Sequence, residues 1–213
     1  MHDMTRQGLA LGIGALLAGM SLEGNAAAQC SARSGADLTP LVELYTSEGC
    51  SSCPPADRWL TSKFRDSRAN WLAFHVDYWD DIGWPDRFAS PLFTQRQRQR
   101  VGAHGGSTVY TPQVMLGDDV RAQWRSGKFD KAVQMQSRQP AKAGLALTMQ
   151  PRDKGWQVRL GAARAGNNAQ ASDGAQVWLA HYADDQTTRV RAGENRGVTL
   201  RHDRVVRRLH GPW

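Results

Sequence analysis

The sequence predicts an α/β protein, with a mixed domain over residues 38–139 and a small antiparallel β domain over residues 143–213. Three observations lead to this prediction. A strand, a helix and a second strand follow one another in the first half of the chain. Two cysteines stand at the junction between the first strand and the helix. Beyond residue 139 helical periodicity is lost, and short strands alternate with Gly, Asn and Asp turns.

The first strand and helix surround the cysteines. Residues 41–45 form a short apolar run, which is typical of a buried strand. The helix that follows has one apolar stripe, made of Ala56, Trp59, Leu60 and Phe64. Pro54 and Pro55 are tolerated only in a first helical turn, where backbone N–H groups have no partner. The helix is therefore expected to begin at or just after the cysteines.

The next elements complete the mixed domain. Residues 71–76 are apolar on both faces, which favours a central parallel strand. Ser90 followed by Pro91 predicts the cap and first turn of a second helix that extends to Arg100. A third strand, a return strand after a tight turn, and a third helix are expected at residues 109–116, 120–124 and 128–138.

The segment after Pro140 and Gly144 has a different texture. Apolar stretches separated by turn residues predict five short strands, at residues 145–149, 156–160, 177–182, 187–191 and 198–200. No helical period is present in this part of the chain. These strands are expected to form the small antiparallel β domain.

The first 28 residues are expected to be a signal peptide. Arg6 gives a basic start, residues 9–22 are apolar, and Ala26 and Ala28 occupy the A-x-A positions of a cleavage site. The apolar run is short and glycine-rich for a transmembrane helix, and an uncleaved anchor is the alternative. The sequence therefore predicts cleavage near Ala28 and a periplasmic or secreted protein, with no membrane association afterwards.

Charge and cysteine content limit the function further. The formal net charge is +7, from 27 Lys and Arg against 20 Asp and Glu. A basic surface suits an anionic partner, but the basic residues are scattered and form no nucleic-acid-binding arm. We therefore expect no nucleic-acid partner. The three cysteines are too few for a small disulfide-stapled fold. Because two of them share one motif, they indicate thiol chemistry or metal binding.

Cys50 and Cys53 form a C-x-x-C motif at the start of the first helix, where they can close a small disulfide ring. The positive end of a helix stabilises a thiolate, and the pKa of a cysteine falls from ~8.5 to ~3.5–7.5 in such places. Cys50 is therefore the expected nucleophile, which forms a mixed disulfide with a substrate, and Cys53 resolves that disulfide. Asp77, at the end of the second strand, is a candidate proton acceptor for Cys53. A turn or cap role for Asp77 is an equal alternative.

The C-x-x-C motif, the order of strands and helices and the Thr111–Pro112 pair together resemble the thioredoxin fold. In that fold a cis-proline loop lies against the disulfide, and the residue before the proline offers backbone hydrogen bonds to the incoming chain. The resemblance therefore implies that Thr111 and Pro112 bind substrate and that the bond between them is cis. The pair of serines between the cysteines, and the prolines directly after them, depart from ordinary thioredoxins.

A narrower resemblance covers most of the predicted mature chain. Its segments are residues 42–57, 74–80, 109–113, 193–197 and 205–207. In these segments the chain is similar to a family of exported bacterial proteins of unknown function with a thioredoxin-like domain. The resemblance implies a thioredoxin-like domain over residues 38–139, with the small β domain after it, but no particular activity.

Metal binding is the main alternative use of the two thiols. Two thiolates are enough for Cu(I) but too few for a closed zinc site. His75 is a candidate third ligand, although its place inside an apolar strand favours a buried core histidine. We therefore assign no metal ligand and no cofactor from the sequence.

The sequence leaves three functions open. The first is an exported thiol–disulfide oxidoreductase that acts on a protein thiol or disulfide. The second is a protein that binds or delivers a metal, copper first, through the same thiols. The third is an envelope interaction module in which the β domain binds and the disulfide is structural. Cys30 is left over and could cap the Cys50 site, pair between chains or stay free. The oligomeric state is left open.

Overall fold

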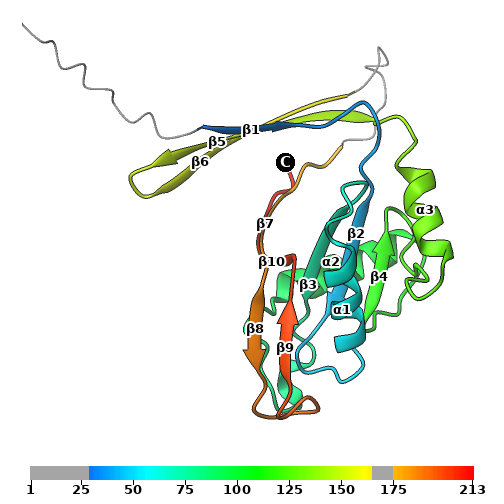
Figure 1. Ribbon diagram of the computed structural model, residues 1–213, viewed down its shortest axis with the longest axis vertical. Helices are drawn as coiled ribbons and strands as arrows, with labels where there is room; N and C mark the ends of the chain where they lie inside the picture. Colours follow the sequence, from blue (N-terminus) through cyan, green and yellow to red (C-terminus); the bar gives the residue numbers. More distant parts are fainter. Residues whose placement is uncertain (1–28, 165–174) are drawn as a thin grey trace, which may run out of the picture.

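The computed structural model describes residues 29–164 and 175–213 of the chain (Figure 1). It shows a mixed α/β protein in which, over these residues, strands outnumber helices. The predicted signal peptide, residues 1–28, lies outside the described residues. In the described ranges each helix is too short or too polar to cross a bilayer.

A five-stranded sheet forms the centre of the protein, in the order β4 (Gln113–Leu116), β2 (Leu41–Thr46), β3 (Asn70–His75), β10 (Val205–His210) and β7 (Leu179–Ala183). β3 runs parallel to β2 and to β10, whereas β4 and β7 run antiparallel to their neighbours. The parallel pairing predicted for β2 and β3 is confirmed. β2 and most of β3 are buried, which accounts for their continuous apolar sequence.

Helices cover both faces of this sheet. α1 (Pro54–Lys63) and α3 (Lys128–Gln136) pack against one face, and α2 (Pro91–Ala103) packs against the other. Side chains alternate along β2, so Leu44 belongs to the core on the α1 side and Tyr45 to the core on the α2 side. The sheet is therefore the middle of three layers.

Local sequence determines where two of the helices begin. Pro54 and Pro55 occupy the first turn of α1, directly after Cys53. Ser90 caps α2, and its hydroxyl accepts a hydrogen bond from the Leu92 N–H at 3.3 Å. Both helix starts agree with the sequence prediction.

A buried ion-pair network ties α2 to the sheet. The carboxylate of Glu43 in β2 is fully buried, 2.6 Å from Arg96 Nη2 and 2.9 Å from Arg100 Nε. Both arginines come from α2, one helical turn apart. The guanidinium of Arg96 also lies over the rings of Phe74 and Trp178. Charge and apolar packing therefore hold the same helix.

Two smaller sheets complete the fold. β1 (Cys30–Arg33), β5 (Ala143–Arg152) and β6 (Gly155–Arg164) form an antiparallel sheet that extends away from the body of the protein in Figure 1. β8 (Gln186–Arg189) and β9 (Thr199–His202) form a two-stranded sheet beside α1. The sequence analysis did not predict β1, because all its residues are exposed and it has no apolar pattern.

Residues 120–124, which were expected to form a return strand, form no strand. A turn brings Ala122 back instead, and its N–H donates to the Val114 carbonyl at 3.0 Å. The side chain of Gln113 donates to the Val120 carbonyl at 2.8 Å. The Gln113 side chain therefore replaces part of the backbone hydrogen bonding of the expected strand pair. The apolar pattern of the sequence cannot indicate such a replacement.

The strands between residues 143 and 213 are shared among all three sheets. The sequence predicts one separate antiparallel domain there, but β10 pairs in parallel with β3, and β7 pairs with β10. Val205 and Val206, at the start of β10, are fully buried. By pairing with β3, β10 covers a strand edge whose backbone N–H and C=O groups would otherwise be unpaired.

Candidate functional site

The candidate site is built around a disulfide bond between Cys50 and Cys53, whose Cα atoms are 5.4 Å apart. Cys50 lies in the turn after β2, and Cys53 is the residue that precedes the first turn of α1. Both cysteines are fully buried, whereas Ser51 and Ser52 between them are exposed. The C-x-x-C ring expected from the sequence is therefore present, with its sulfur atoms shielded from solvent.

The start of α1 gives the disulfide its electrostatic setting. The N–H groups of Ala56 and Asp57 donate to the Cys53 carbonyl, which closes the first turn of the helix. The hydroxyl of Ser52 lies 3.3 Å from Cys50 Sγ. A thiolate on either cysteine would lie at the positive end of a ten-residue helix and would be stabilised there.

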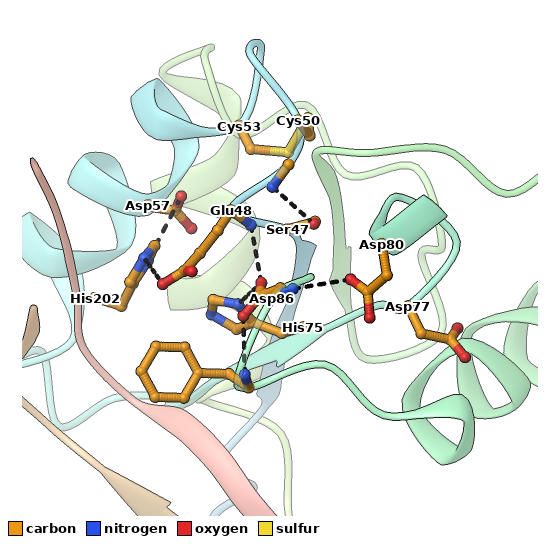
Figure 2. A network of polar contacts seen from close by, with 12 residues as sticks. Ser47, Glu48, Cys50, Cys53, Asp57, His75, Asp77, Asp80, Asp86 and His202 are labelled. Carbon is orange, nitrogen blue, oxygen red and sulfur yellow. Dashed lines mark hydrogen bonds and ion pairs between the residues drawn. A yellow bond between two sulfur atoms is a disulfide. The ribbon is translucent and has the colours of Figure 1, made fainter. Parts of the chain in front are cut away.

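A buried histidine and two carboxylates lie behind the disulfide (Figure 2). His202 Nε2 is 3.5 Å from Glu48 Oε1, and His202 Nδ1 is 3.8 Å from Asp57 Oδ2. Burial opposes a charged imidazole, but the two carboxylates outweigh it and raise the pKa of His202 to about 10. Burial also works against a charged Glu48, yet the neighbouring His202 and the hydrogen bond from Trp84 hold the pKa of its carboxyl below the usual range. The group is therefore an imidazolium between two carboxylates.

A second buried pair supports the first. His75 Nδ1 lies 2.6 Å from Asp86 Oδ2, and both side chains are completely buried. Burial raises the pKa of Asp86, but the neighbouring His75 outweighs this effect and lowers it overall. The same Asp86 oxygen accepts the Glu48 N–H at 2.8 Å, and the rings of His75 and His202 are 4.9 Å apart. Asp86 thus fixes the backbone of the cysteine loop.

A loop from the C-terminal part of the chain lies over the cysteine loop. Asn195 is buried, and its Nδ2 donates to the carbonyls of Glu48 at 2.8 Å and of Cys50 at 3.0 Å. The carboxylate of the neighbouring Glu194 accepts the Ser51 N–H at 3.0 Å. We call residues 193–197, between β8 and β9, the strap. Its contacts join segments of the chain that lie far apart in the sequence.

The Thr111–Pro112 loop meets the cysteine loop through one tryptophan. The Thr111–Pro112 peptide bond is cis, as the resemblance implies. Trp79 Nε1 donates to Thr111 Oγ1 at 2.8 Å. A Cβ placed on Gly49 would lie only 3.1 Å from Trp79 Cβ, so Trp79 also packs against the residue before Cys50. The backbone N–H and C=O of Thr111 make no hydrogen bond to another residue that the structure describes.

A model of the family described as "Protein of unknown function (DUF1223)" matches residues 41–213. The chain belongs to this family. The matched region contains the disulfide, the buried histidines and the strap. The crystal structure of protein AGR_C_4864 from Agrobacterium tumefaciens is similar, with 28% identity, a TM-score of 0.55 and coverage of 84% of this chain and 76% of that chain. No curated protein matches the chain.

In this DUF1223 protein Asp77 lies apart from the disulfide (Figure 2). The Asp77 carboxylate accepts a hydrogen bond from the Thr94 hydroxyl at 2.5 Å, and the Asp77 N–H donates to the oxygen of that hydroxyl at 3.2 Å. The structure therefore ties Asp77 to α2. Asp57, four residues after Cys53 on α1, and His202 lie nearer to the disulfide (Figure 2).

Sequence reasoning missed most of the residues around the disulfide. Asp57 carries a usable signal, since it lies four residues after Cys53 and therefore on the same side of α1. Glu194 and Asn195 fall in the segment 193–197 that carries the family resemblance, but the sequence gives them no role. His202 carries no signal, because only the tertiary fold brings β9 to α1. His75 is buried as expected, and within the described residues no group of His, Cys, Asp and Glu side chains has the arrangement of a metal site.

Proposed function

We propose that this DUF1223 protein is an exported thiol–disulfide oxidoreductase. The observation that carries the proposal is the place of the disulfide: it closes at the N-terminus of α1, with the His202–Asp57–Glu48 group buried behind it. The helix end stabilises a thiolate, and the buried group can exchange a proton with it. A disulfide that only braces the fold needs neither neighbour.

The thioredoxin-like interpretation belongs to this proposal. The parallel β2 and β3, the intervening α1 that begins at the cysteines, and the antiparallel β4 after the Thr111–Pro112 loop support it. In such a domain the free backbone groups of Thr111 would pair with an extended substrate segment. Tyr110 and Pro112, the two neighbours of Thr111, line an open groove of about 400 Å³ together with Trp124. We therefore take the substrate to be a protein chain.

Exchange in the oxidising direction requires two substrate thiols. A substrate thiolate attacks Cys50 Sγ, the bond between the two enzyme sulfurs breaks, and Cys53 leaves with the electron pair. The second substrate thiolate then attacks the substrate sulfur of the mixed disulfide and releases Cys50. The substrate is oxidised to a disulfide, and the enzyme is left with two reduced cysteines. The reverse sequence reduces a substrate disulfide.

The leaving Cys53 thiolate needs a proton at the moment the disulfide opens. Asp57 lies one turn after Cys53 on α1, and its carboxylate faces the protonated His202. In our proposal His202 supplies the proton through this carboxylate, and takes it back when Cys53 attacks a mixed disulfide. Removal of a proton from a buried group is thus coupled to breaking of the sulfur–sulfur bond.

Trapping is the direct test. A Cys53→Ser variant in a Cys30→Ser background keeps the attacking thiol and removes both other cysteines. Expressed in its natural compartment, it should accumulate mixed disulfides with protein partners, visible as bands that disappear on reduction. The matched Cys50→Ser variant should accumulate far fewer. Equal and low trapping by both variants would contradict the oxidoreductase proposal.

Export is the part of the proposal that concerns the N-terminus. If the signal peptide is removed as the sequence predicts, the protein purified from the periplasm or the medium begins at Gln29. Mass determination of the intact protein measures this directly. If the protein is found in the membrane fraction and still contains residues 1–28, the segment is an uncleaved anchor and the export proposal is wrong.

A structural disulfide is the second candidate, and one observation favours it. Cys50 and Cys53 are both fully buried, and a buried sulfur does not meet a substrate thiol. In that case the protein would serve as an interaction module of the cell envelope. The two candidates differ in the rate at which a small thiol reduces the folded protein, because an inert structural disulfide reacts only when the protein unfolds.

A further inference from the structure

The burial of the cysteines poses a chemical problem for the proposed exchange, on which this inference rests. In-line attack requires that a substrate sulfur reach Cys50 Sγ, yet Cys50 is fully buried in the oxidised protein. Ser51 and Ser52 are exposed, so the loop itself lies at the surface. Something next to the loop must therefore move before a substrate can bind.

The strap is the segment placed to move. Asn195 donates to the carbonyls of Glu48 and Cys50, on both sides of Gly49. Glu194 accepts the Ser51 N–H. The strap therefore occupies three backbone groups of residues 48–51, which are groups that an incoming extended chain could use instead. It connects β8 to β9, and these two strands pair with each other and not with the central sheet.

The hydrogen bonds of the strap are few. Besides its contacts with the cysteine loop, the Arg196 N–H donates to the Gly193 carbonyl, the Gly197 N–H to the Val190 carbonyl and the Val198 N–H to the Asn195 carbonyl. Glu194 itself is exposed, so only Asn195 is a buried anchor. The two hydrogen bonds from the Asn195 side chain are therefore the main polar contacts between the strap and the cysteine loop. Their energy is within the range that a binding substrate supplies.

Glu194 also affects the charge at Cys50. Its hydrogen bonds with Ser51 lower the pKa of the carboxyl, so it is negatively charged near neutral pH. The carboxylate is held at the Ser51 N–H, next to Cys50, and a negative charge so close to Cys50 disfavours a Cys50 thiolate. The other titratable groups around the motif are Glu48 on its own loop and, from the packed elements, Asp57, His75, Asp80, Asp86 and His202.

We propose that the strap is a displaceable cover of the redox site, in which Asn195 holds the cover closed and Glu194 suppresses the reactivity of Cys50 until a substrate displaces it. Glu194 is thus a residue that sets reactivity, not one that touches the reacting atoms. The substrate class that fits is a protein segment in extended conformation, since only backbone groups are released at residues 48–51.

Alkylation tests the role of Glu194 without any natural substrate. Reduced protein in a Cys30→Ser background is treated with iodoacetamide between pH 5 and 9, and modification of Cys50 is followed by mass. Glu194→Gln keeps the side-chain oxygen and removes the charge, and should be alkylated about three to ten times faster than the parent protein at pH 6. Asp153→Asn removes an equal charge from the exposed β5–β6 turn and should match the parent protein.

Reduction tests the cover itself. Asn195→Asp keeps the size of the side chain but replaces the Nδ2 donor with an oxygen that repels the two carbonyls. Dithiothreitol should reduce its disulfide about five or more times faster than that of the parent protein. Trypsin should also cut after Arg196 sooner in this variant. If Asn195→Asp perturbs folding by circular dichroism, Glu194→Ala, on an exposed side chain, serves in the same two assays.

The outcomes separate this inference from the proposed function. Unchanged alkylation in Glu194→Gln, or unchanged reduction in folded Asn195→Asp, would overturn the strap inference. Neither result depends on a protein substrate. Trapping experiments that recover no partner would instead count against the oxidoreductase, while the reactivity of Cys50 in these variants would still report on the cover.

Discussion

His202 Nδ1 lies 3.8 Å from Asp57 Oδ2, and this contact joins the penultimate strand of the described chain to the helix that begins at the cysteines. Both side chains are buried. The relationship makes the candidate site depend on two parts of the sequence that have no local connection. In the mechanism that we propose, this imidazole is the source of the proton for Cys53.

Replacement of His202 by Gln should slow disulfide exchange with a dithiol by about ten- to a hundredfold, because the proposed proton store is lost. The pH dependence of exchange should change shape in the same variant, which distinguishes a role in proton transfer from a structural role. Asp77→Asn is the matched control, and exchange in it should stay within about twofold of the parent protein because Asp77 bonds to Thr94. Equal effects of the two substitutions would remove His202 from the mechanism.

The same histidine makes stability depend on pH. Its pKa is about 10 in the folded protein, above the ordinary 6.5, so folding takes up a proton at neutral pH. The resulting stabilisation is complete below pH 6.5 and is lost as the pH rises from 6.5 toward about 10. Urea unfolding should therefore show a loss on the order of 2–4 kcal/mol across this window. The loss should be smaller in His202→Gln, and parallel curves for the two proteins would contradict a protonated His202.

The buried Glu43 network should be intolerant of the loss of one partner. Arg96→Met leaves the Glu43 carboxylate with Arg100 alone, and should lower the free energy of unfolding by about 2–4 kcal/mol. The double variant Glu43→Gln with Arg96→Met removes the unpaired charge as well, so it should recover part of the loss. A double variant that is no more stable than Arg96→Met would mean that the packing of Arg96 on Phe74 and Trp178 dominates.

Gly49 should resist substitution for steric reasons. A Cβ on this residue would lie 3.1 Å from Trp79 Cβ and 3.3 Å from the Trp79 carbonyl oxygen. Gly49→Ala should therefore cost roughly 1–2 kcal/mol and weaken the contact of Trp79 with Thr111. Gly102→Ala is the matched control, since a Cβ there meets nothing within 4 Å, and it should be neutral or stabilising in α2. Thermal unfolding followed by tryptophan fluorescence measures both changes.

The elements that the sequence predicted well have local causes. The start of α1 follows from Pro54 and Pro55, and the start of α2 from Ser90 and Pro91. The buried strands β2 and β3 follow from their apolar runs. Local sequence also located the disulfide, because the two cysteines are neighbours on one turn.

The features that the sequence did not predict depend on contacts between distant segments. The pairing of β10 with β3 joins Val205 to Ala73, and no periodicity in either strand specifies that partner. Asn195 and His202 are ordinary turn and strand residues until the fold places them at Cys50 and Asp57. Asp77 was a candidate by its position at the end of β3, and the structure shows its carboxylate bonded to the Thr94 hydroxyl of α2, a contact that the sequence did not indicate.

The position of β10 has a consequence for how the protein is made. The central sheet lacks two of its five strands until residue 210 has been synthesised, since β7 joins the sheet only through β10. Asn195 and His202 also arrive late. During most of synthesis the cysteine loop therefore lacks its contacts with Asn195, and the edge of β3 lacks its partner β10. This order suits the export that we propose, because a chain whose central sheet is still incomplete can cross a membrane in extended form.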